Sequence, residues 1–107
     1  MMLNDKNQSM CWECLAKYGI QSQLIKLMEE CSELQKATCK MIISEHTSNA
    51  SDNFLEELVD TIVMCQAMVL LYRLPERTIN EMAAAKLERA LGKGDAVGTE
   101  KERGDAQ

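Results

Sequence analysis

The chain has 107 residues, of which 46% are hydrophobic, and its formal net charge is −5 at pH 7. This length allows one domain with a modest core, which self-association would help to stabilise. The acidic balance argues against a nucleic-acid polymer or an anionic membrane as a partner, because both attract clustered Lys and Arg. An anionic ligand would need help from a cation, such as a metal ion.

The N-terminal stretch and the cysteines indicate the compartment. "MMLNDKNQSM" lacks the basic-then-apolar pattern of a secretion signal, and no apolar run reaches the ~18 residues needed to span a bilayer. The five cysteines are an odd number, which suits reduced thiols better than a disulfide framework. We therefore expect a cytoplasmic protein.

The predicted elements are all helical, because one proline, five glycines and 4% aromatic residues leave few strand or turn signals. In chain order, the pattern predicts helices over 11–18, 20–43, 54–73 and 75–91, with breaks at Gly19 and before Pro75. The polar stretch "SEHTSNASDN" is expected to form a loop, with Asn53 and Glu56 as a capping box. Residues 1–91 would form one domain, and the glycine-rich, charged tail 92–107 is expected to be disordered.

The second predicted helix carries carboxylates beside its apolar face. At about 100° per residue, one apolar stripe contains Leu24, Leu27, Cys31, Leu34, Thr38 and Met41. Glu30 is expected on the shoulder of this stripe and Glu33 one turn further along, whereas Glu29 should face solvent.

The third predicted helix adds a second pair of carboxylates. Glu57 and Asp60 are spaced i, i+3 and share a face, which continues into apolar residues, namely Met64, Met68 and Leu71. Burying unpaired carboxylates is costly, so a cation partner is expected. Hard divalent cations suit an all-oxygen ligand set. A buried ion pair with Lys86 or an arginine is the alternative.

A ferritin-like di-iron site fits this sequence less well. The Glu-x-x-His pairs of such sites are missing. The single histidine, His46, falls in the predicted loop, where we expect it to be exposed.

The two acidic motifs together resemble a known family. "EECSE" at 29–33 and "ELVD" at 57–60 are similar to the EExxE…ExxD pattern of the MazG-like all-α nucleoside triphosphate pyrophosphohydrolases. The resemblance extends from about Tyr18 to "AAAKLERAL" on the last helix. It implies a four-helix MazG-like bundle completed by oligomerisation, as a dimer or a dimer-based tetramer.

The resemblance also implies an activity and a set of metal ligands. The expected reaction is hydrolysis of a ribo- or deoxyribonucleoside triphosphate to the monophosphate and pyrophosphate, in nucleotide-pool house-cleaning. Mg²⁺, or Mn²⁺ in its place, would be held by Glu30, Glu33, Glu57 and Asp60. Glu29 could act as a base or orient water, although an exposed helix glutamate explains it equally well.

Other residues are candidates for substrate contact. Lys86 falls in the middle of the apolar stripe of the last helix, where an ammonium group needs an anion nearby, and Arg89 lies at its edge. The family carries basic residues on this helix near the substrate phosphates. Trp12 and Tyr18 could stack on a nucleobase and Gln23 could form a hydrogen bond with one, but helix packing explains all three as well.

Two other classes of function stay open. The chain could be a non-catalytic helical interaction module or an inactive relative of the family, in which the acidic face is simply solvated. Cys11 and Cys14 form a C-x-x-C that could bind zinc or cycle redox states, but a second C-x-x-C or His pair at ordinary spacing is missing. Helix packing is therefore the favoured explanation of these two cysteines.

Overall fold

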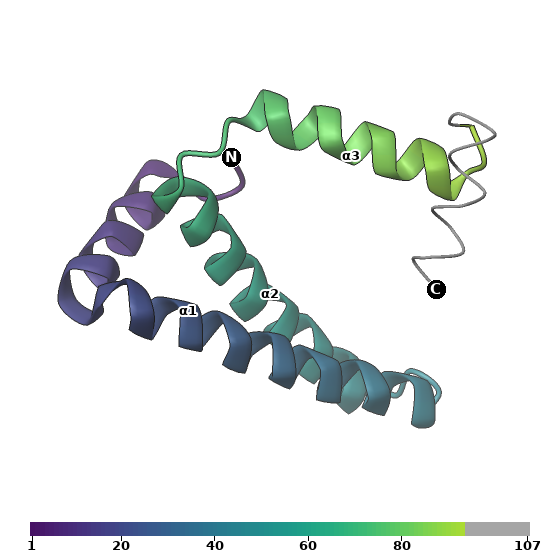
Figure 1. Ribbon diagram of the computed structural model, residues 1–107. Helices are drawn as coiled ribbons and strands as arrows, with labels where there is room; N and C mark the ends of the chain where they lie inside the picture. Colours follow the sequence, from purple (N-terminus) through teal and green to yellow (C-terminus); the bar gives the residue numbers. More distant parts are fainter. Residues whose placement is uncertain (94–107) are drawn as a thin grey trace. The chain divides into compact units, whose positions relative to one another are not determined.

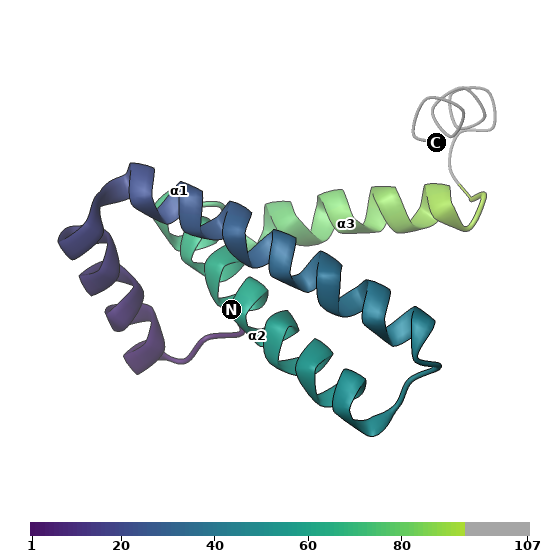
Figure 2. The ribbon, with the colours of Figure 1, turned by 90° about the horizontal axis from the view of Figure 1, so that it is seen from below.

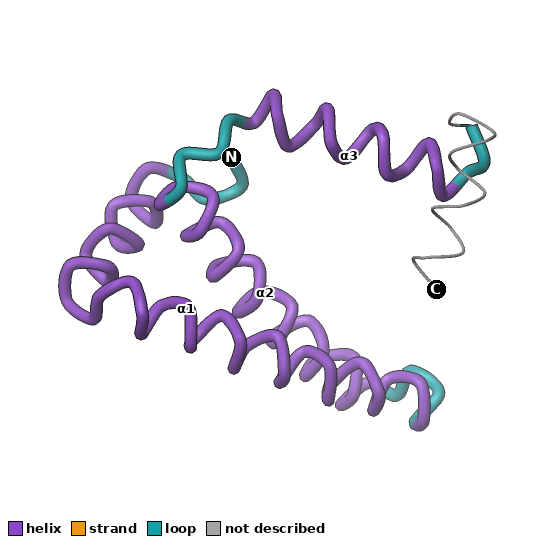
Figure 3. Tube along the Cα trace, in the orientation of Figure 1, coloured by secondary structure: helices purple, strands orange, loops and turns teal. Residues whose placement is uncertain are grey.

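The computed structural model describes residues 1–93, which form three helices and no strand. Helix α1 spans Asp5–Ile43, α2 spans Ser48–Leu71 and α3 spans Glu76–Ala90 (Figure 1; Figure 3). The predicted all-α class is thus confirmed. The chain divides into two compact units, Met1–Arg73 and a second that begins at Leu74 and contains α3. None of the helices in residues 1–93 combines the length and apolar character needed to cross a bilayer.

Helix α1 contains a sharp kink at Gly19, the residue at which the sequence predicted a break between two helices. Gly19 has φ 82° and ψ 164°, a region of backbone space that only glycine adopts readily. Figure 2 shows the abrupt change of direction, which separates the segments 5–18 and 20–43 of α1. The two predicted N-terminal helices therefore exist as the two arms of one kinked element.

The first arm begins earlier than predicted, at Asp5 instead of Cys11. Asn4 caps it, because its side-chain oxygen accepts a hydrogen bond from the Asn7 backbone N–H at 2.9 Å. The chain before this cap is tied to α2, since the backbone nitrogen of Met2 donates to Oε1 of Gln66 at 3.1 Å. The predicted start was wrong because this asparagine cap was overlooked.

The second arm of α1 packs against α2, and the two lie side by side in Figures 1 and 2. The less exposed side chains of this arm recur every three or four residues, at Gln23, Leu27, Glu30, Leu34, Ala37 and Met41. This stripe differs from the predicted one, because Leu24, Cys31 and Thr38 are exposed. Ala37 is only 1% exposed, so α2 approaches this face closely. Glu30 therefore lies within the stripe and not on its shoulder.

Helix α2 also begins earlier than predicted, at Ser48 instead of Phe54, which makes the proposed Asn53–Glu56 capping box wrong. The connection from α1 is short, and both Glu45 and His46 adopt positive φ angles in it, of 54° and 65°. His46 is exposed, as expected.

Helix α3 follows Pro75, which occupies the N-cap position in an extended conformation. The helix ends at Ala90, and Gly92 beyond it has a positive φ of 74°. These boundaries agree with the prediction to within a residue. The predicted disordered tail, from residue 94 onward, lies outside the described residues.

Candidate functional site

Three of the four predicted metal-binding carboxylates come together between α1 and α2. Glu30 from α1 and Glu57 and Asp60 from α2 each present an oxygen atom within 4.8 Å of the others. Glu30 is 9% exposed, Glu57 is half-buried and Asp60 is exposed. We call these three residues the carboxylate cluster.

Glu30 has a cationic partner that the sequence interpretation missed. The Lys26 ammonium nitrogen lies 3.0 Å from Oε1 of Glu30, one turn earlier on the same helix. The spacing i, i+4 is the signal that could have revealed this pair. The hydrogen bond and charge of Glu30 raise the pKa of Lys26, with smaller contributions from Glu29 and Asp60. One ammonium group thus faces several carboxylates.

Thr61 holds the two helices together at the level of the cluster. Its hydroxyl donates a hydrogen bond to the backbone carbonyl of Glu57 at 2.9 Å and lies 3.2 Å from the carbonyl of Glu30. The threonine therefore bridges α2 to α1 at two backbone positions that carry cluster carboxylates. Sequence reasoning passed over Thr61, because a threonine within a helix is ordinarily a weak signal.

The cluster has an excess of negative charge that would favour a cation. Desolvation raises the pKa of Glu57, and the charges of Asp60, Glu33 and Glu30 raise it further. The neighbouring negative charges that raise the pKa of Glu57 would also attract a divalent cation. The arrangement can therefore hold a hard cation with oxygen ligands.

Glu33 does not join the three-carboxylate cluster, although it was predicted as a ligand. Its side chain is 50% exposed, and its Oε1 lies 3.5 Å from the ammonium of Lys36. Its charge nevertheless contributes to the raised pKa of Glu57, so Glu33 borders the cluster. Glu29 is exposed, as predicted, and lies outside the cluster.

The raised pKa of Glu57 predicts a pH dependence of stability. The folded state holds the proton of the Glu57 carboxyl group more tightly than the unfolded chain does. Stability should therefore be lost as the pH rises through the raised pKa, and regained as the pH falls toward the unfolded pKa of about 4.3. We expect Glu57→Gln to raise Tm at pH 7 and to remove part of the gain in Tm that the wild type shows as the pH falls from 7 toward about 4.3. Thermal melts with the exposed Glu13→Gln as control would check this, and identical pH profiles for both variants would contradict it.

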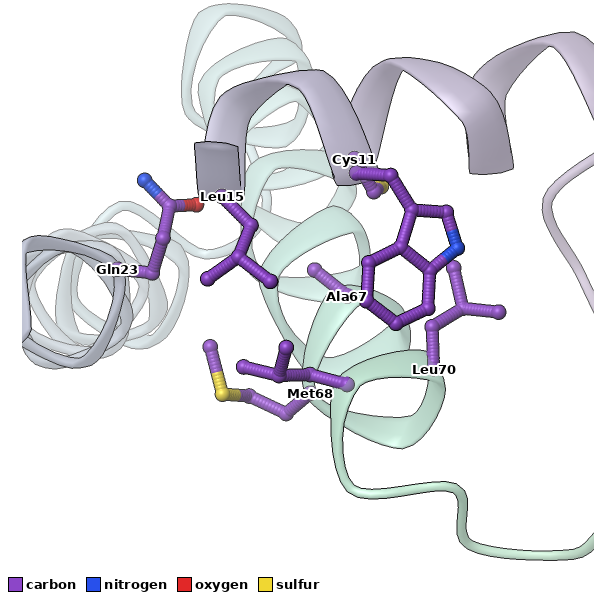
Figure 4. Close-up of a pocket in the computed structure, with 8 residues that line it drawn as sticks. Cys11, Leu15, Gln23, Ala67, Met68 and Leu70 are labelled. Carbon is purple, nitrogen blue, oxygen red and sulfur yellow. The ribbon is translucent and has the colours of Figure 1, made fainter. Parts of the chain in front are cut away.

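Trp12 and Gln23, predicted to contact a nucleobase, line the same pocket (Figure 4). Its other walls come from the first arm of α1 and from α2, namely Cys11, Leu15, Ala67, Met68, Leu70 and Leu71. The free volume is about 10 Å³, roughly that of one water molecule. Trp12 therefore contributes to helix packing at this pocket, and a base cannot enter it without rearrangement.

Tyr18, unlike Trp12 and Gln23, does not line this pocket. It is 54% exposed, and its ring faces the Lys17 ammonium at 5.2 Å. Lys86 and Arg89 lie on α3, in the second compact unit. Lys86 is exposed there, and the predicted contact of both residues with phosphates stays a prediction.

Cys11 and Cys14 lie one turn apart on the first arm of α1, as free thiols. Burial raises the pKa of Cys11, and the neighbouring Cys14 raises it further. A raised pKa keeps the thiol protonated, which disfavours both nucleophilic reactivity and metal binding. Helix packing thus remains the favoured explanation for Cys11, which is partly buried, whereas Cys14 is exposed.

No protein-family model, curated protein or solved structure matches the chain.

Proposed function

We propose that the chain is a metal-dependent nucleoside triphosphate pyrophosphohydrolase, which releases pyrophosphate and leaves the monophosphate. The observation that carries this proposal is the convergence of Glu30, Glu57 and Asp60 from two helices to within 4.8 Å. These residues stand at three of the four ligand positions implied by the EExxE…ExxD resemblance. Glu33, at the fourth, lies close enough to affect the pKa of Glu57.

The donor set fits Mg²⁺, or Mn²⁺, held by Glu30, Glu57 and Asp60 with Glu33 at the edge. When bound, such an ion neutralises the triphosphate and lowers the pKa of a water molecule that attacks the α-phosphorus. The protein's own residues contribute by holding the carboxylates in position. Thr61 and Lys26 hold the backbone and side chain of Glu30, whereas Asp60, being exposed, can reach the incoming substrate. Glu29 would accept a proton from the attacking water or orient it.

The position of attack is testable with isotopically labelled water. Attack at the α-phosphorus places ¹⁸O from water in the nucleoside monophosphate, whereas attack at the β-phosphorus places it in pyrophosphate. Mass spectrometry of the products should therefore find the label only in the monophosphate. Label in pyrophosphate, or release of inorganic phosphate with a diphosphate, would assign a different reaction to this site.

One observation favours a second candidate, a non-catalytic helical interaction module. Lys26 already forms an ion pair with Glu30, and Asp60 is exposed, as in a solvated acidic surface. Calorimetric titration with Mg²⁺ distinguishes the two candidates. Saturable binding that Asp60→Asn weakens supports the hydrolase, and absence of binding supports the interaction module.

Lys86 is proposed to contact the substrate phosphates. Lys86→Met keeps the length of the side chain but deletes its charge, so we expect kcat/KM to fall about tenfold or more, equivalent to about 1.4 kcal/mol, with little change in Tm. Lys93→Met, which removes a lysine beyond the end of α3, is the matched control. Unchanged kinetics together with a large loss of stability would instead make Lys86 a structural ion-pair partner.

We also propose that the active form is a homo-oligomer, a dimer or a dimer-based tetramer. Leu55 and Val59 lie one turn apart on α2 and are 55% and 56% exposed. Large aliphatic side chains exposed on one helix face are suited to contact with a second copy. Light scattering at micromolar concentration should therefore give at least twice the 12.0 kDa chain mass, and a stable monomer would refute this part of the proposal.

A further inference from the structure

A second cavity, of about 250 Å³, lies within the first compact unit. It is bounded by the start of the chain, the first arm of α1, Gln23 and α2, and its walls are Leu3, Asn7, Met10, Cys11, Cys14, Gln23, Val63, Met64 and Ala67. None of these side chains is charged at neutral pH, and most are apolar. The cavity is therefore large enough, and neutral enough, for one heteroaromatic ring.

The polar groups at this cavity are two carboxamides on opposite arms of α1. Gln23 is half-buried, and its side chain has no hydrogen-bond partner among residues 1–93. Asn7 is also half-buried and lines the same space. A carboxamide offers a donor and an acceptor side by side, and the polar atoms of these two carboxamides are not fully buried, so a ligand can reach them. Gln23 is thus available to a ligand.

The cavity walls carry sulfur atoms from both the first arm of α1 and α2. Met10 and Met64 contribute thioethers and Cys11 and Cys14 contribute thiols. Thioether sulfur makes favourable contacts with aromatic rings. Such walls suit the faces of a flat base, whose edge would meet the carboxamides.

The cavity lies beside the carboxylate cluster along the seam between α1 and α2. Gln23 precedes Glu30 by seven residues, or about 10 Å along the helix at 1.5 Å per residue. On α2, the cavity residue Met64 follows Asp60 by one turn. A nucleotide with its phosphates at the cluster could therefore extend its sugar and base along the seam to the cavity.

We propose that this cavity binds the base of the substrate, and that Gln23, together with Asn7 on the first arm, recognises the hydrogen-bonding edge of that base. The inference rests on the proposed hydrolase function and assigns its specificity to the first arm of α1. It also moves the base away from the nearly filled pocket at Trp12. A neutral base fits this site, because no charged side chain lines it.

Gln23→Leu tests the proposal, with Gln21→Leu as the matched control, since Gln21 is exposed on the same helix and does not line the cavity. Both variants and the wild type would be assayed with nucleotides that differ only in the base, and with inorganic tripolyphosphate, which has none. We expect Gln23→Leu to lower kcat/KM for the preferred nucleotide about tenfold or more and to reduce the differences in kcat/KM among nucleotides with different bases. Tripolyphosphate turnover and Mg²⁺ binding should stay unchanged.

The outcomes separate the two proposals. If Gln23→Leu retains the wild-type base preference while the wild type hydrolyses nucleotides, the cavity assignment falls and the hydrolase stands. Equal losses on nucleotides and tripolyphosphate would show a structural effect and also overturn the base contact. If the wild type neither hydrolyses a nucleotide nor binds a non-hydrolysable analogue with Mg²⁺, the proposed function itself fails.

Discussion

Asp60→Asn is expected to lower pyrophosphate release by about 100-fold or more while leaving the helices intact. The substitution replaces an anionic ligand with a neutral side chain of nearly the same shape. Replacing even a residue that only supports a metal ligand typically lowers metal affinity or activity 10–100-fold. Steady-state kinetics at saturating Mg²⁺, together with calorimetric Mg²⁺ titration, would measure the effect.

Stability should not explain such a loss. Asp60 is exposed, and its charge is one of those that raise the pKa of Glu57, so neutralising it relieves repulsion. We therefore expect Tm of Asp60→Asn to equal or exceed that of the wild type. Asp52→Asn makes the same chemical change at an exposed position two turns earlier on α2 and should leave activity unchanged. Turnover of Asp60→Asn close to that of the wild type would remove Asp60 from the metal site.

Gly19→Ala should have the largest effect on stability. An alanine at φ 82°, ψ 164° would be strained by about 1–3 kcal/mol. Apart from its chain neighbours and the adjacent backbone of its own helix, nothing lies within 4 Å of the added Cβ, so the expected loss is a backbone effect and not a clash. Urea unfolding would measure it as a lower midpoint.

The same substitution should also impair nucleotide selection. Relief of the strain favours a straighter α1, which would move the first arm and its cavity residues away from α2. We expect base preference to weaken even at temperatures where the protein stays folded. Ser22→Ala, an exposed change one turn beyond the kink, is the control. A Gly19→Ala protein with wild-type stability and base preference would show that the kink is dispensable.

Local signals allowed much of the fold to be predicted. Gly19 and Pro75 interrupt the helical pattern because one permits positive φ and the other lacks a backbone donor, and both breaks are where the sequence places them. Of the polar stretch predicted as loop, residues 44–47 do connect the helices, but residues 48–53 were misassigned, because serine and asparagine also favour turns. There the helix continues back to Ser48, beside α1, with the Ser51 hydroxyl 3.5 Å from the Met41 sulfur.

The candidate site could be predicted only in part. The i, i+3 spacing identified Glu57 and Asp60, and helical phase identified Glu30, although a small error in phase placed Cys31 in the stripe and Glu30 beside it. Glu33 stays a predicted ligand, and it lies outside the three-carboxylate cluster because spacing along a helix does not determine which side chains reach the partner helix. The 250 Å³ cavity was missed, because it requires the first arm to fold back on α2, which no local pattern encodes.

The most direct test is a panel of canonical and modified nucleoside triphosphates incubated with the purified full chain, with Mg²⁺ or with EDTA. Pyrophosphate and nucleoside monophosphate would be measured together. We predict equimolar release of both from at least one nucleotide, dependent on Mg²⁺ and reduced by Asp60→Asn but not by Asp52→Asn. Absence of metal-dependent release from every nucleotide, at protein concentrations that support the oligomer, would contradict the assignment of a pyrophosphohydrolase site to the carboxylate cluster.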